Sequence, residues 1–106
     1  VMTAADDFMD EFAREDGFFL GLHQRQFDPV AAERALQALR QIEIGTDHGT
    51  NYLLADHMFQ ADFELRAHEH YNRDNKQFER YHRLFFDEIA LRFVALGSLG
   101  ETLRRE

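Results

Sequence analysis

The sequence predicts an all-α fold, most simply an antiparallel four-helix bundle in a single domain spanning residues 1–106, with a kinked or split first helix and a Phe-rich core. Three observations predict it. Apolar residues recur every three or four positions along most of the 106-residue chain, which is 44% hydrophobic and contains 11 phenylalanines. Helix-start signals stand at three places. Strand signals are nearly absent, because no Asn-Gly or Asp-Gly turn separates alternating segments.

The first helix is expected to begin near the N-terminus, where Thr3 or Asp6 can cap it. Aspartates in its first turns complement the positive end of the helix dipole. A straight continuation through Gly17 would place Glu15 and Asp16 on the apolar face, so we expect a break near Asp16–Gly17. Residues 17–27 are predicted to be helical again. The apolar side of the first helix is formed by Phe8, Met9 and Phe12.

The second helix is expected to start at Asp28-Pro29. Asp28 can accept a hydrogen bond from a free amide of the first turn, and Pro29 occupies a position that needs no N–H donor. Gly45 is expected to end this helix, because glycine readily adopts the left-handed backbone conformation that follows many helices. The buried stripe between these points is narrow and consists of Ala32, Ala35, Leu36, Leu39 and Ile42.

Two longer helices follow a loop at residues 46–50. Asp47 or Thr50 is expected to cap the third helix, which runs to about Tyr71, and the fourth runs from about Asn75 to Leu96 or beyond. The predicted apolar arc of the third helix comprises Leu54, Ala55, Met58, Ala61 and Leu65, widened by Tyr52, Phe59 and Phe63. The predicted inner face of the fourth helix comprises Phe78, Tyr81, Phe85, Ile89, Phe93 and Leu96, with Phe86 at its margin.

Charge and composition exclude several classes of function. Twenty acids against 12 bases give a formal net charge of −8, which repels phosphate backbones and anionic lipid, so we expect neither nucleic acid nor a membrane as a direct partner. No 18-residue apolar run and no signal-peptide pattern is present. The absence of cysteine removes disulfides and thiolate nucleophiles. A cytoplasmic location is the resulting expectation.

The negative charge is concentrated in two segments, and it suggests a binding function. Residues 1–16 carry a balance of −5 and residues 46–72 a balance of −4. Closely spaced carboxylates can attract a protein with a basic surface and make the association salt-sensitive. We therefore expect a small non-catalytic binding protein, of the inhibitor, immunity or regulatory type. The expected contact residues are Asp6, Asp7, Asp10, Glu11, Glu15 and Asp56.

A histidine–carboxylate group suggests an alternative function. His57, Glu64 and His68 share one face of the third helix by their spacing of seven and four residues, and His82 follows Glu79 in a Glu-x-x-His motif. If the two helices fold back at Asn72–Asn75, these side chains approach one another and could bind iron, zinc or manganese. The protein would then be a sensor, a carrier or an oxidative enzyme. Di-iron bundles use two such motifs, however, and this chain has one.

Self-association is the third hypothesis. The apolar arcs of the third and fourth helices exceed what one small bundle can cover, which favours a structural protein that forms a homodimer. Asp62, Arg66 and Glu69 interrupt the arc of the third helix, and Arg92 that of the fourth. A buried charge must be paired, so we expect Asp62 and Arg66 to pair with each other or with Arg92 and His82.

Overall fold

The computed structural model describes the backbone of residues 3–105 and the side chains of residues 3–97. This part of the chain is all-α and contains no strand, which confirms the all-α part of the prediction. In chain order the elements are α1 (Ala4–Asp10), α2 (Phe18–His23), α3 (Pro29–Arg40), α4 (His48–His68), the 3-10 turn η1 (His70–Asn72) and α5 (Lys76–Arg105).

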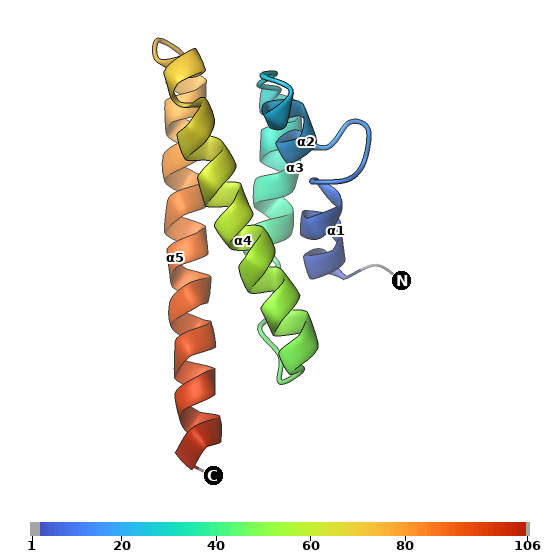
Figure 1. Ribbon diagram of the computed structural model, residues 1–106, viewed down its shortest axis with the longest axis vertical. Coiled ribbons are helices and arrows are strands. Elements are labelled where there is room, and N and C mark those ends of the chain that lie inside the picture. The colour runs from blue at the N-terminus through green and yellow to red at the C-terminus, as the bar shows by residue number, and fades with distance from the viewer. Residues whose placement is uncertain (1–2, 106) are drawn as a thin grey trace.

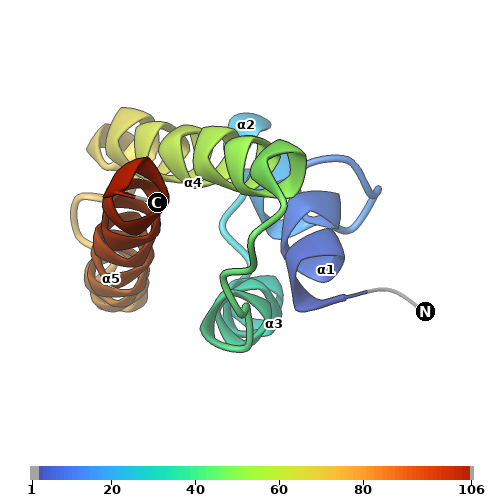
Figure 2. The ribbon, with the colours of Figure 1, turned by 90° about the horizontal axis from the view of Figure 1, so that it is seen from below.

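The two long helices form one side of an elongated molecule that measures 49 × 28 × 18 Å. Helices α4 and α5 are antiparallel and come together at the end where η1 joins them, and they diverge toward the other end (Figure 1). Helix α3 packs against α1 and α5, and α2 packs against α4 and α3. Figure 2 shows α5 and α1 on opposite sides of the molecule, with α3 and α4 between them. No helix in the described part of the chain is long and apolar enough to cross a membrane.

The three helices for which a capping residue was predicted all have one of the predicted residues at the N-cap. Thr3 caps α1 in a reciprocal capping box, in which its hydroxyl accepts from the Asp6 N–H and its own N–H donates to the Asp6 carboxylate. Asp28 accepts from the Val30 N–H at 3.0 Å and so caps α3. Asp47 accepts from the Thr50 N–H at 3.2 Å and caps α4. Short polar side chains in front of apolar periodicity therefore identified these starts correctly.

The expected break in the first helix lies between α1 and α2. Helix α1 ends at Asp10, with Glu11 as its C-cap, and α2 starts after the N-cap Gly17. Gly17 is required for steric reasons, because a Cβ atom there would lie 2.4 Å from the Glu11 carbonyl oxygen. The helical stretch predicted for residues 17–27 is shorter than expected. It ends at His23, and Arg25 turns the chain toward α3 with a positive φ of 63°.

The expected stop at Gly45 is wrong. Helix α3 ends at Arg40, and no described glycine has a positive φ. The chain leaves the helix early and remains close to the core, where Ile42 is buried and Ile44 packs against the buried cluster. Apolar contact, rather than a left-handed glycine, therefore shapes this connection.

The core is rich in phenylalanine, as predicted. Phe18 and Phe19 of α2 meet Phe85 of α5, and the Phe18 and Phe85 rings stack with centroids 5.5 Å apart. The buried residues of α4 are Leu54, Met58, Ala61, Leu65 and His68. Two parts of the prediction are corrected. Tyr52, Phe59 and Phe63 do not widen the buried arc of α4 but are exposed, and Phe93 of α5 is 41% exposed. An aromatic side chain can occupy the outer face of a helix, so its presence does not define the core.

Candidate protein-binding surface

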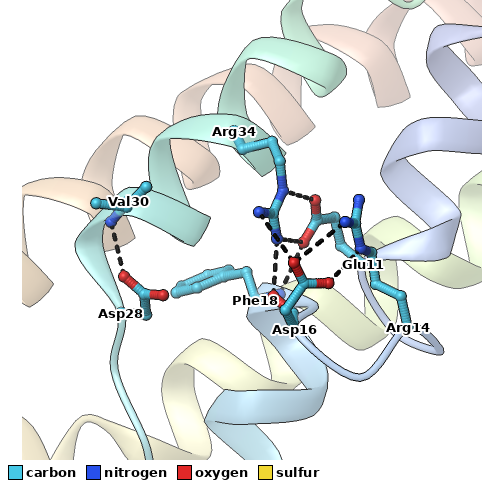
Figure 3. A network of polar contacts seen from close by, with 7 residues as sticks. All are labelled: Glu11, Arg14, Asp16, Phe18, Asp28, Val30 and Arg34. Atoms are coloured by element: carbon cyan, nitrogen blue, oxygen red, sulfur yellow. Dashed lines mark hydrogen bonds and ion pairs between the residues drawn. The ribbon is translucent and has the colours of Figure 1, made fainter.

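Glu11 is the centre of a buried polar network that joins α1, α2 and α3 (Figure 3). Its carboxylate is 2% exposed and accepts two hydrogen bonds from the Arg34 guanidinium, at 2.6 and 3.0 Å. The same carboxylate accepts from the Phe18 N–H at 2.8 Å, and the Glu11 carbonyl oxygen accepts from the Phe19 N–H. Arg34 also donates to the Asp16 carbonyl oxygen at 2.8 Å. The hydrogen bond to Glu11 raises the pKa of Arg34.

Because of this network, fewer carboxylates of the N-terminal segment are available to a partner than the sequence predicts. Glu11 is corrected from a contact residue to a buried one, because its charge is used by Arg34 and by the first turn of α2. Asp16 binds Arg14 and also approaches Arg34, and the hydrogen bond from Arg14 lowers its pKa. Asp6 is occupied in the capping box, where hydrogen bonds from the Thr3 N–H and hydroxyl lower its pKa.

Three predicted contact residues of this segment stay without a cationic partner among the described side chains. Asp7 and Glu15 are exposed and Asp10 is half-buried, and none of them forms an ion pair within residues 3–97. Asp56 is exposed on α4 and accepts from Gln60 Nε2 at 3.1 Å. The Phe12 ring packs edge-on against the ring of His57, with centroids 5.1 Å apart. This contact places the end of the α1 segment next to the turn of α4 that carries Asp56.

The four expected metal ligands do not meet. His57 hydrogen-bonds the Leu53 carbonyl oxygen through Nδ1 at 2.7 Å. His82 packs against Phe78 and lies in a separate hollow between the end of α4 and the start of α5. Within the described residues no group of three or more His, Asp or Glu side chains could hold a metal ion. His57 and His68 share a helix face, but they are eleven residues apart. This spacing separates them by about 16 Å along the helix axis, which is too far for both to bind one ion.

Glu64 and His68 do lie together, and their third neighbour is a residue that the sequence analysis did not select. His23, from α2, places Nδ1 at 3.1 Å from Glu64 Oε1, and His68 Nδ1 lies 3.4 Å from Glu64 Oε2 and 2.9 Å from the Glu64 carbonyl oxygen. The group joins α2 to α4. Nothing in the sequence indicated that His23 would join this group, because it is 41 residues away from Glu64 along the chain.

The charges on the arcs of α4 and α5 are paired locally. Arg66 binds Asp62 at 2.8 Å one helical turn away, which confirms the expected pair. Arg92 does not join them. It binds the Glu88 carboxylate at 2.7 Å and the Glu88 carbonyl oxygen at 3.1 Å, within its own helix. Glu88 also accepts from Arg40 of α3 at 3.3 Å, so these pairs support the packing of α5 against α3.

A surface that the sequence analysis assigned to the core lies on the two long helices. Five aromatic side chains of α4 and α5 are between 41% and 75% exposed. We call them the aromatic face: Tyr52, Phe59 and Phe63 of α4, and Phe86 and Phe93 of α5. Exposed aromatic side chains in such a group are typical of protein–protein contacts. Comparison with protein-family models, with curated proteins and with solved structures finds no match for this chain.

Proposed function

We propose that this protein is a non-catalytic binding protein whose partner is another protein with a basic surface, acting as an inhibitor or regulator of that partner. The observation that carries the proposal is the set of Asp7, Asp10 and Glu15, which has no cationic partner among the described residues and lies in a helix and loop whose single base, Arg14, is bound to Asp16. We call these three carboxylates the acidic surface. Asp56 is also exposed, on α4.

The physical argument is electrostatic. The formal charge of −8 gives the molecule a long-range negative field. Carboxylates that are not neutralised within the protein can pair with lysine or arginine across an interface, and such pairs speed association and select the partner by charge. Salt screens pairs at the rim of an interface, so the complex is expected to weaken as ionic strength rises.

The test is affinity capture with a charge-matched control. The variant Asp7→Lys/Asp10→Lys/Glu15→Lys reverses the acidic surface on the N-terminal segment. The control Glu43→Lys/Asp74→Lys/Glu79→Lys reverses three exposed carboxylates elsewhere. Each reversal changes the charge by two, so both variants go from a formal charge of −8 to −2. Proteins retained from the native cell extract are identified by mass spectrometry at low and at high salt.

The proposal expects one basic protein that the wild type and the control retain at low salt, that high salt releases, and that the acidic-surface variant loses. It is rejected if every retained protein binds both variants equally, since only net charge would then matter. It is also rejected if the retained protein resists high salt.

A further inference from the structure

The aromatic face combines side chains from two helices on one side of the molecule. Tyr52, Phe59 and Phe63 are 75%, 67% and 62% exposed, and Phe86 and Phe93 are 47% and 41% exposed. At about 100° per residue, each of these side chains lies roughly 80–140° around its helix from the buried positions Met58 and Phe85. They are therefore neither core residues nor isolated side chains on the far surface.

The contacts of both helices show that the two sets emerge on the same side. The other flank of α4 faces α1 and α2, since His57 packs on Phe12 and Glu64 meets His23. Phe59 therefore lies on the flank of α4 that borders α5.

The corresponding flank of α5 faces α3, where Tyr81 donates to Glu33 at 2.9 Å and Glu88 accepts from Arg40. Phe86 therefore lies on the flank of α5 that borders α4. The two flanks therefore adjoin along the seam between α4 and α5, which come together at the η1 end (Figure 1).

We propose that the aromatic face binds the same face of a second copy of this chain, so that α4 and α5 of two copies form an intermolecular four-helix bundle. An antiparallel helix pair is self-complementary in this way. A twofold axis parallel to the pair places α4 of one copy across α5 of the other, and every helix is then antiparallel to both neighbours. The proposal is independent of the acidic surface.

The area of the aromatic face is sufficient for a dimer. An aromatic side chain offers about 200 Å², so the exposed fractions of the five residues amount to roughly 600 Å² per copy. Two copies would bury about 1,200 Å², which is the lower end of the range for specific interfaces. Backbone and flanking side chains add to this value.

The exposed charges beside the aromatic rings have both signs, so two copies can pair them across a contact. Arg66, which binds Asp62, and Arg83 lie beside Asp56, Glu79 and Asp87. Two copies that meet here keep their acidic α1 segments on the outside, at a distance where salt screens their repulsion.

Sedimentation equilibrium on the full chain tests the proposal. At concentrations on the order of 100 µM, the measured molar mass of the wild type is expected to be that of two 12.5-kDa chains. Phe59→Ser/Phe63→Ser removes two exposed rings from each copy and is expected to weaken the dimer at least roughly 100-fold. The control Val30→Ser/Leu91→Ser removes two apolar side chains that are 74% and 64% exposed on other flanks, and is expected to remain dimeric.

Circular dichroism verifies that the helical content of each variant is unchanged. A wild type that stays monomeric overturns the proposal, as does a dimer that tolerates Phe59→Ser/Phe63→Ser. Dissociation by Asp7→Lys/Asp10→Lys/Glu15→Lys also overturns it, since the acidic surface would then form the contact. A monomeric wild type leaves the capture experiment with the basic partner unaffected, so the two proposals fail separately.

Discussion

At the scale of single residues, Glu11 joins the three N-terminal helices by hydrogen bonds. Its carboxylate neutralises Arg34 and satisfies the first amide of α2. The sequence contained a signal for this role, because Glu11 follows Phe8 by three residues and precedes Phe12, so it lies at the edge of the apolar face. The identity of Arg34 as its partner could not be predicted, since the two residues are 23 positions apart.

Replacement of Glu11 by alanine is expected to lower the free energy of unfolding by about 2–4 kcal/mol, because Arg34 and the Phe18 N–H lose a buried acceptor. Urea denaturation measures the change. Arg14→Ala is the control, since its ion pair with Asp16 is exposed and contributes little to stability. Equal losses in the two variants would contradict the structural role assigned to Glu11.

Gly17 provides a second prediction at this scale. A methyl group at this position would meet the Glu11 carbonyl oxygen at 2.4 Å, and that oxygen already accepts hydrogen bonds from α2. Gly17→Ala is expected to cost about 1–3 kcal/mol of stability. Gly45→Ala meets no atom within 4 Å and is expected to cost nothing in the same urea titration. A harmless Gly17→Ala would show that the connection between α1 and α2 can relax.

At the scale of elements, the start of α4 depends on one carboxylate. Hydrogen bonds from the Thr50 hydroxyl and from the Thr50 N–H lower the pKa of Asp47 below its ordinary value of 3.8. The ionised form is therefore favoured in the folded protein. Its contribution is complete above the ordinary pKa and is lost as the pH falls through the lowered value.

Asp47→Asn should consequently reduce the drop in melting temperature between about pH 5 and pH 3, since asparagine also caps a helix but does not titrate. Asp6, Asp16 and Glu33 also have lowered pKa values, so part of the drop should remain. Asp74→Asn is the control, because Asp74 has no side-chain hydrogen bond within the described part of the chain. Thermal melts by circular dichroism give the comparison. An unchanged drop in Asp47→Asn would refute the cap as the cause.

Helix starts could be predicted from the sequence, whereas helix ends and helix faces could not. Thr3, Asp28 and Asp47 act on amides two or three residues away, so the sequence contains the whole interaction. The end of α3 depends on how Ile42 reaches a core built by other helices. Apolar periodicity also could not separate an aromatic residue that packs inside from one such as Phe59 that faces outward, because both belong to a broad apolar arc.

At the scale of the whole molecule, the two candidate surfaces are separated. The acidic surface lies mainly on the α1 side and the aromatic face on the seam of α4 and α5, and α1 and α5 occupy opposite sides of the molecule (Figure 2). With this separation, one molecule could bind a copy of itself and a basic partner at the same time, as the two proposals require. The two surfaces also differ in the interaction that they offer. Burial of the aromatic face would be largely insensitive to salt, whereas charge pairing at the acidic surface would weaken as salt is added.

Dimerisation through the aromatic face should couple stability to concentration. A dimer that dissociates on unfolding becomes more stable by mass action as the protein concentration rises, by about 1.4 kcal/mol of dimer for each tenfold increase. We therefore expect the melting temperature of the wild type to increase by a few degrees over that range.

The matched variants extend this test. Phe59→Ser/Phe63→Ser should melt at a temperature that does not depend on concentration, because the folded monomer keeps its core of Phe18, Phe19 and Phe85 and loses only the contact between copies. The Val30→Ser/Leu91→Ser control should retain the wild-type dependence. A wild type whose melting temperature is constant would show that α4 and α5 are stable with their aromatic side chains in water, and the folded unit would then be the single chain.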